Sequence, residues 1–139
     1  KRACGYGRIP LDEYIKEAPD AMCRIAQIEH IDAVNDLDNM LKIKGCDAFI
    51  VGPCDLSGSI GLLNETKHPK VVALMKTVIE KCRNAGRPIG VAAAYGGAED
   101  IAFWHDLGFN FISSGTDTAA IIARAQEQVA VMSKIFKRS

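Results

Sequence analysis

The chain has 139 residues, of which 17 are basic and 17 acidic, so its formal net charge at pH 7 is zero. Because no basic stripe stands out, neither nucleic acid nor an anionic membrane is expected as a partner. Apolar residues make up 48% of the sequence, yet no apolar run reaches the ~20 residues of a membrane span.

Apolar periodicity and turn residues predict helices and strands in alternation along the chain. Pro10 opens a short helix that Pro19 and Asp20 are expected to end. A long irregular segment, 52–68, lies between the second strand and a strong helix, and a Gly-rich turn at 95–97 precedes the next helix. We expect helices over 10–18, 31–41, 69–83, 98–107 and 118–136, and strands over 22–28, 48–51, 88–93 and 110–113.

These elements form four successive βα units without a linker. Residues 45–55 and 108–117 resemble each other, which supports a repeating unit. Repeats of this kind are typical of a (β/α)₈ barrel, which has about 250 residues. Four parallel strands cannot close a barrel. The pattern therefore predicts either an open α/β sheet or one half of a barrel.

Two carboxylates follow neighbouring predicted strands, each where the strand meets a turn. Glu29 ends the first strand, and Asp55 follows the second after Gly52 and Pro53. Because a crossover helix makes the two strands parallel, both carboxylates emerge at the same carboxyl edge, where α/β folds place their chemistry. Two acidic oxygens there predict a site for a hard divalent cation. Taken alone, the same residues also fit a helix cap or a salt bridge.

The sequence Ala-Gln-Ile-Glu at 26–29, followed by Gly-Cys-Asp-Ala-Phe-Ile-Val-Gly-Pro-Cys-Asp-Leu-Ser at 45–57, closely resembles the HpcH/HpaI aldolase family. The resemblance continues through 64–69, 86–92 and 108–117 and so covers almost the whole chain. It implies a metal-dependent, class II aldolase. Such an enzyme reversibly cleaves a 4-hydroxy-2-oxo acid, such as a 2-keto-3-deoxy sugar acid, to pyruvate and an aldehyde through a metal-stabilised pyruvate enolate.

The resemblance also implies the fold and the site residues. Residues 1–139 would be the C-terminal half of one (β/α)₈ TIM barrel domain, comprising strands 5–8 and the last helix. Glu29 and Asp55 would be the metal ligands, Gln27 a hydrogen-bond donor to substrate, and the backbone N–H groups of Cys54 and Asp55 the cradle for the pyruvate carboxylate. All-oxygen ligands favour Mg²⁺ or Mn²⁺, with Co²⁺ as a further candidate, over zinc.

Two further features are implied by the family. Its base, a histidine, and its transition-state arginine come from the first half of the barrel, so the 139 residues alone are expected to be inactive and His30, His68 and His105 take neither place. The native protein is expected to be a homo-oligomer in which the last helix contacts a neighbouring subunit. That helix carries an apolar stripe of Ile121, Ile122, Ala125, Val129, Met132 and Phe136.

Two alternatives remain open at this point. One is a lyase of the citrate-lyase type acting on a CoA thioester, although the spacing Gln27-x-Glu29 favours the aldolase branch and no adenine-nucleotide site is evident. The other is a catalytically incomplete α/β fragment with a role in assembly. The five cysteines have no regular spacing, which indicates reduced thiols and a cytoplasmic protein rather than a disulfide framework or a zinc site.

Overall fold

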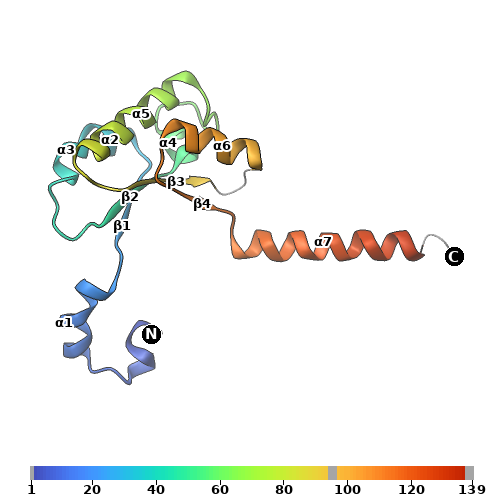
Figure 1. Cartoon of the computed structure of the whole chain (residues 1–139), viewed down its shortest axis with the longest axis horizontal. Helices are drawn as coiled ribbons and strands as arrows, with labels where there is room; N and C mark the ends of the chain where they lie inside the picture. The colour runs from blue at the N-terminus through green and yellow to red at the C-terminus, as the bar shows by residue number, and fades with distance from the viewer. Residues whose placement is uncertain (1, 94–96, 137–139) are drawn as a thin grey trace.

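The computed structural model describes residues 2–93 and 97–136, so the turn expected at Tyr95 and Gly96 lies outside the described residues. Its centre is a four-stranded parallel sheet in which consecutive strands are neighbours (Figure 1). The strands are β1 (Ile25–Ile28), β2 (Ala48–Val51), β3 (Ile89–Ala93) and β4 (Phe111–Ser114). This arrangement confirms the predicted α/β class and the parallel order.

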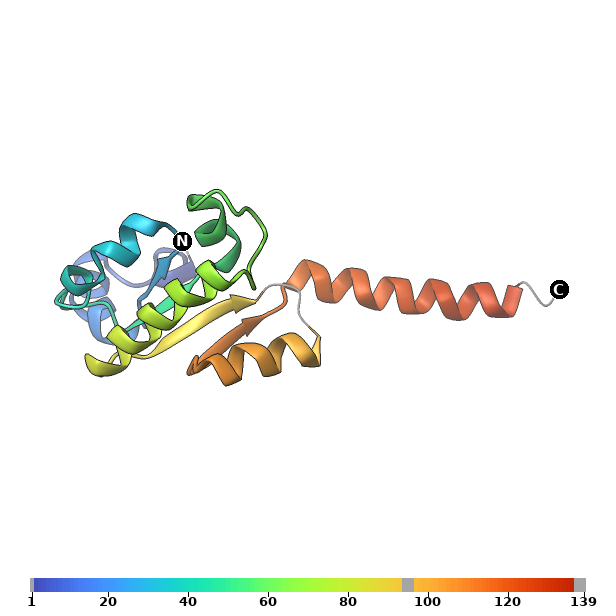
Figure 2. The same cartoon turned by 90° about the horizontal axis from the view of Figure 1, so that it is seen from above.

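Helices precede, connect and follow the strands (Figure 2). Most predicted helices are present within one or two residues of their expected ends. The 3₁₀ helix is η1 (Arg2–Gly7), and the α-helices are α1 (Leu11–Ala21), α2 (Ile31–Asn35), α3 (Leu37–Met40), α4 (Pro53–Ser59), α5 (Pro69–Asn84), α6 (Ala98–Leu107) and α7 (Asp117–Phe136).

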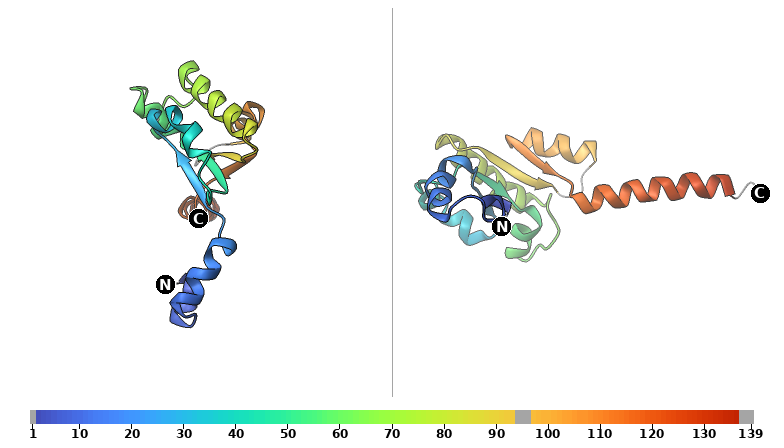
Figure 3. Two further views of the ribbon diagram at one scale, coloured as in Figure 1. Left: turned by 90° about the vertical axis from the view of Figure 1, so that its left-hand side faces the viewer. Right: turned by 90° about the horizontal axis from the view of Figure 1, so that it is seen from below.

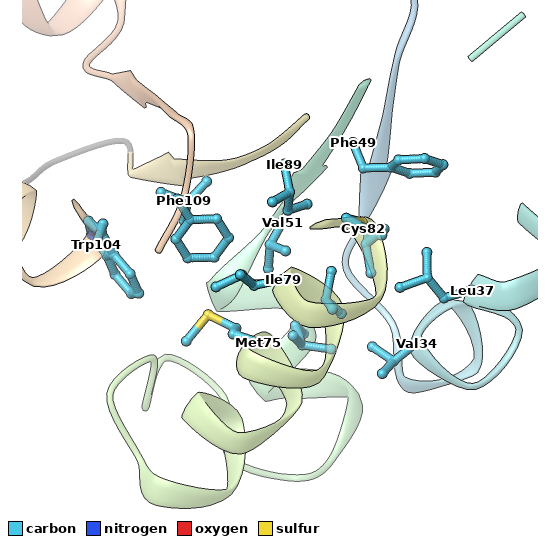
Figure 4. Close-up of a cluster of buried hydrophobic side chains, with 14 of the residues drawn as sticks. Val34, Leu37, Phe49, Val51, Met75, Ile79, Cys82, Ile89, Trp104 and Phe109 are labelled. Atoms are coloured by element: carbon cyan, nitrogen blue, oxygen red, sulfur yellow. The ribbon is translucent and has the colours of Figure 1, made fainter. Parts of the chain in front are cut away.

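The hydrophobic core lies between one face of the sheet and the connecting helices, which gather on that side in Figure 1. Apolar residues of α5 recur at helical spacing and are buried against the strands. Trp104 of α6 and Phe109 close the cluster at the β4 end (Figure 4). From the strands the core receives Ile28, Phe49, Val51, Ile89, Val91 and Ala93, and from α5 it receives Val71, Met75, Val78, Ile79 and Cys82.

The opposite face of the sheet is not covered by the helices that connect the described strands. Alternation along the strands and their register put Gln27, Ile50, Gly90 and Phe111 on this face in one row. A Cβ at Gly90 would collide with the ring of Phe111, so the ring lies across this glycine. We call this side the open face.

The first helix is longer than predicted, because Pro19 lies inside α1 instead of ending it. Proline lacks an N–H donor, but its fixed φ is compatible with a helix. The helix continues for one more turn, and the N–H of Met22 donates to the carbonyl of Ala18 at 3.2 Å. As a consequence β1 begins at Ile25 rather than at the predicted residue 22.

The helix predicted over 31–41 is divided into α2 and α3 at Asp36. The backbone of Asp36 has φ −93° and ψ 7°, outside the helical range, and its carboxylate accepts a hydrogen bond from the Asn39 side chain at 2.6 Å. Short polar side chains compete with helical hydrogen bonds in this way. The apolar stripe is kept across the break, since Val34 and Leu37 are both buried.

The segment 52–68 was expected to be irregular, but it contains the helix α4. Pro53 occupies the first helical position, where a missing N–H costs nothing. Pro53, Leu56 and Ser57 are buried and fix α4 to the core. This helix carries Asp55 and therefore matters for the candidate site.

The last helix, α7, extends away from the sheet (Figures 2 and 3). None of its described side chains is buried, and its apolar stripe is exposed, with 70% of Ile121 and 58% of Val129 accessible. In the described part of the chain, none of the helices combines the length and apolarity needed to cross a bilayer.

Candidate metal and substrate site

Gln27 and Glu29 lie two residues apart at the carboxyl end of β1, so their side chains share the open face. The side-chain amide of Gln27 donates from Nε2 to Oε2 of Glu29 at 2.6 Å. Both side chains are exposed, while Ile28 between them is fully buried on the other face. The sheet thus presents a carboxylate and an amide together at its edge, as the sequence predicts.

Gly52, which directly follows β2, lies beside this pair. Its N–H donates to the carbonyl of Ile28 at 3.0 Å, one residue beyond the paired strand positions. A Cβ at Gly52 would lie 2.9 Å from Nε2 of Gln27 and 3.3 Å from Oε2 of Glu29. The missing side chain therefore leaves the room that the Gln27–Glu29 pair occupies.

Asp55 is exposed in the first turn of α4, which begins directly after Gly52. The first N–H groups of a helix have no partner within the helix, and Gly52 offers no side chain to cap them. The first amide that bonds back is that of Leu56, to the carbonyl of Gly52 at 2.9 Å. The N–H groups of Cys54 and Asp55 therefore have no acceptor within α4.

The side chain of Cys54 is exposed and lies 3.7 Å from Oδ1 of Asn64, measured from Sγ. Cys23, Cys46, Cys54 and Cys82, the cysteines whose side chains are described, are all free thiols. Burial raises the pKa of the Cys82 thiol to about 11. Cys54 thus places a free thiol next to the candidate site, with no disulfide partner among the described cysteines.

Ser59, the last residue of α4, forms hydrogen bonds with backbone groups near Glu29 and near Asp55. Its hydroxyl accepts from the N–H of Ile31 at 3.0 Å and donates to the carbonyl of Leu56 at 2.7 Å. Ile31 begins the helix that follows Glu29, and Leu56 directly follows Asp55. We call this pair of hydrogen bonds the Ser59 bridge.

The chemistry of the donor set fits a hard divalent cation. Glu29 and Asp55 supply carboxylate oxygens, the ligands that Mg²⁺ and Mn²⁺ prefer. Over residues 2–93 and 97–136 there is no group of three or more His, Cys, Asp or Glu side chains placed to hold a metal. A cation held by two carboxylates keeps positions for substrate oxygens and water, as Mg²⁺ sites commonly do.

Two of the three histidines cap helices. Nδ1 of His30 accepts from the N–H of Asp32 at the start of α2, and Nδ1 of His68 accepts from the N–H of Lys70 at the start of α5. His105 is exposed near the end of α6, 3.1 Å from the carboxylate of Asp106. These contacts give His30 and His68 structural roles.

Lys67, in the segment before α5, forms an ion pair with Asp100 in the first turn of α6. Its Nζ also lies 4.9 Å from the ring centre of Phe103. The hydrogen bond from Lys67 lowers the pKa of Asp100 below its ordinary value. This exposed pair ties together the segments that follow β2 and β3.

Sequence reasoning placed Gln27, Glu29 and Asp55 at one edge but did not predict the contacts of Gly52 and Ser59. Gly52 carried a readable signal, since a glycine before Pro53 at a strand end indicates a close approach. Ser59 had no such signal, because a serine at a helix end has many partners available and only the fold brings Ile31 to it.

Comparison with known proteins places the chain in a family. The profile of the HpcH/HpaI aldolase/citrate lyase family matches residues 4–124. A 4-hydroxy-2-oxo-heptane-1,7-dioate aldolase of Shigella sonnei (strain Ss046) is 36% identical over 130 residues, which are 93% of this chain and 47% of the relative. A 2-keto-3-deoxy-L-rhamnonate aldolase of Escherichia coli O1:K1 / APEC is also 36% identical, over 84% of this chain and 42% of the relative.

Solved structures agree with the sequence relatives. The crystal structure of an HpcH/HpaI aldolase from Desulfitobacterium hafniense DCB-2 matches with a TM-score of 0.70 and 31% identity, over 89% of this chain and 48% of that one. The chain spans about half the length of the curated relatives it matches. It belongs to the HpcH/HpaI aldolase/citrate lyase family.

Proposed function

We propose that the protein containing this chain is a class II aldolase that reversibly cleaves a 4-hydroxy-2-oxo acid to pyruvate and an aldehyde. The observation that carries the proposal is the grouping of Gln27, Glu29 and Gly52 on the open face. Gly52 in turn directly precedes α4, the helix that bears Asp55. Relatives at 36% identity are named as aldolases of 4-hydroxy-2-oxo and keto-deoxy acids, which supports the substrate class.

The full-length protein is proposed to be a (β/α)₈ barrel to which residues 1–139 contribute strands 5–8 and the last helix. Two features support this. Within the described residues β1 and β4 are the edges of the sheet, and exposed parallel edges call for further strands. The open face would become the barrel interior, and its carboxyl end is the usual place of catalytic residues.

Each site residue has a proposed role. Glu29 and Asp55 would hold a divalent cation, with Mg²⁺ or Mn²⁺ favoured by their oxygen ligands. When bound, the cation supplies a Lewis acid that polarises the oxo group and stabilises the charge developing there as the carbon–carbon bond breaks. Gln27 keeps one N–H for the substrate while the other bonds Glu29. The N–H groups of Cys54 and Asp55 would hold the pyruvate carboxylate.

The base and the arginine that the family requires are proposed to come from the remainder of the barrel. The 139 residues alone would then bind the cation and pyruvate weakly and show no turnover. The free thiols of the described cysteines support the cytoplasm as the proposed location, because thiols stay reduced there. None of these observations favours the CoA-thioester lyase or the assembly fragment over the aldolase.

Chelation and borohydride distinguish the proposed mechanism from that of a Schiff-base aldolase. Activity of the full-length protein should be lost on treatment with EDTA and return with Mn²⁺ or Mg²⁺. Borohydride in the presence of pyruvate should leave it unchanged, since no lysine imine forms. Irreversible inactivation by borohydride with pyruvate, together with resistance to EDTA, would refute the proposal.

The native protein is further proposed to be a homo-oligomer in which α7 contacts a neighbouring subunit. The support is the exposed apolar stripe on α7, which includes Val129 and Met132. Replacing both with Asp should lower the sedimentation mass of the full-length protein. Ala123→Asp with Ala130→Asp adds the same charge on the opposite side of α7 and should leave the mass unchanged. A folded Val129→Asp/Met132→Asp protein of wild-type mass would contradict this proposal.

A further inference from the structure

The Ser59 bridge satisfies backbone groups at two helix ends at once. Ile31 is the first residue of α2, so its N–H has no acceptor within that helix. At the other end of the bridge, the N–H of Ile60 bonds to the carbonyls of Ser57 and Gly58, not to that of Leu56. The hydroxyl of Ser59 serves both orphan groups, accepting from Ile31 and donating to Leu56.

The two bonded backbone groups lie next to the two candidate metal ligands. Ile31 is two residues after Glu29, and Leu56 is one residue after Asp55. Glu29 lies beyond the last paired residue of β1, and Asp55 lies in a helix, so neither carboxylate is held by the strand ladder itself. Within the described residues, the bond from Ile31 to Ser59 is the one hydrogen bond that joins α2 to α4.

We propose that Ser59 is a positioning residue that fixes the separation of Glu29 and Asp55 and thereby the affinity of the site for a divalent cation. This inference rests on the proposed function, since it takes the two carboxylates as the metal ligands. Ser59 itself contacts neither carboxylate; it acts through the backbone on either side of them. Groups bonded directly to metal ligands commonly contribute ~10-fold or more to affinity, and we expect an effect at the lower end of that range from this backbone link.

Mn²⁺ binding to the full-length protein, measured by the loss of the free-ion EPR signal, tests the proposal without relying on activity. Ser59→Ala should weaken Mn²⁺ binding ~10-fold. Ser59→Thr keeps the hydroxyl and should bind Mn²⁺ as the wild type does. His30→Ala is the matched control, because it removes another cap from the same end of α2 but no link to α4. It should keep its affinity within ~2-fold, against the ~10-fold expected of an orienting group.

Thermal melting of each metal-free protein, measured beside its titration, shows whether the variant is folded. If Ser59→Ala does not fold, Ser59→Cys replaces it, since sulfur fills the volume and is only a weak hydrogen-bond partner. Wild-type Mn²⁺ affinity in a folded Ser59→Ala or Ser59→Cys protein would overturn the proposal. Equal losses in Ser59→Ala and His30→Ala would also overturn it, because fraying of α2 would then explain both.

Asp55→Asn separates this inference from the proposed function. Loss of Mn²⁺ binding in Asp55→Asn with no change in Ser59→Ala would reject the positioning role alone. Unchanged Mn²⁺ binding in Asp55→Asn would reject the metal site, and with it the proposed function. Loss in Asp55→Asn, a ~10-fold weakening in Ser59→Ala and recovery in Ser59→Thr is the result expected here.

Discussion

The two faces of the sheet differ in their surroundings: one is packed against the helices, and the other carries the candidate site. In β1, Ile28 is fully buried against the helices, whereas Gln27 and Glu29 on either side of it are exposed on the open face. In β2, Val51 is fully buried, and Gly52, directly after the strand, leaves room for the Gln27–Glu29 pair. Because side chains alternate along a strand, neighbouring residues lie on the buried face and on the face of the candidate site.

This comparison has a direct consequence for mutagenesis. Substitutions on the helix-covered face should change the free energy of unfolding and spare metal binding in the molecules that remain folded. Substitutions on the open face should do the reverse, because exposed polar side chains contribute little to burial. The following experiments, in the full-length protein, test this division from the largest expected effect to the smallest.

Glu29→Gln and Asp55→Asn should have the largest effect on function. Each change removes a charge at nearly constant volume from an exposed position, so thermal stability should be retained. A metal Lewis acid is worth several kcal/mol to the transition state, so we expect kcat/KM for aldol cleavage to fall about a thousandfold. More than a few per cent of wild-type rate with added Mn²⁺ or Mg²⁺ would contradict the assignment.

Met75→Ala should have the largest effect on stability. Met75 is fully buried on α5, and truncation of such a side chain costs about 3 kcal/mol through lost burial and the cavity left behind. Urea unfolding measures this loss, and Mn²⁺ affinity below the transition should equal that of the wild type. Lys76→Ala, at the exposed neighbouring position, serves as the control. A large loss of Mn²⁺ affinity in folded Met75→Ala would contradict the expectation that substitutions on the helix-covered face spare metal binding.

Gly52→Ala should weaken Mn²⁺ binding by about tenfold, or ~1.4 kcal/mol, with a smaller effect on melting temperature. Its φ of −97° is open to alanine, so the expected conflict is with the Gln27 and Glu29 side chains and not with the backbone. Gly97→Ala is a matched control, because Gly97 is also the N-cap of a helix and a Cβ there meets nothing within 4 Å. Equal Mn²⁺ affinities in the two variants would contradict the role given to Gly52.

Lys67→Met should give the smallest effect. The hydrogen bond from Lys67 is the chief cause of the lowered pKa of Asp100. The ionised Asp100 therefore contributes to stability at pH values above 3.8, its ordinary pKa, and this contribution is lost as the pH falls through the lowered pKa. In Lys67→Met the pKa of Asp100 should rise toward that ordinary value, as an NMR titration would measure. Because the pair is exposed, the change in stability at neutral pH should be slight. An unchanged Asp100 titration would show that Lys67 does not set it.

Much of this architecture could be predicted from local sequence. The helix from Ala98 to Leu107 has its predicted ends, and the strands after Gly45 differ from prediction by one residue at most, because apolar periodicity and Gly/Pro punctuation are local signals. The errors arose where side chains or context override these signals. Asp36 interrupts a continuous apolar stripe, and Pro19 is accommodated near a helix end.

The candidate site, like the fold, could be predicted only in part. Gln27, Glu29 and Asp55 could be assigned to one edge because strand order and the family motif are both visible in the sequence. The contacts of Gly52 and Ser59 could not, since each depends on a neighbour brought near only by the fold: Gln27 across the strand pair and Ile31 across the helix pair. The exposure of α7 could not be predicted either, because an apolar stripe does not say which surface will cover it.

A crystal structure of the full-length protein with Mg²⁺ and pyruvate is the most direct test of the central claim, that the open face holds a catalytic cation. We expect one cation bound by a carboxylate oxygen from each of Glu29 and Asp55, at about 2.0–2.1 Å, with pyruvate on the same side of the sheet. A cation bound elsewhere, or pyruvate bound without contact to either carboxylate, would contradict the account.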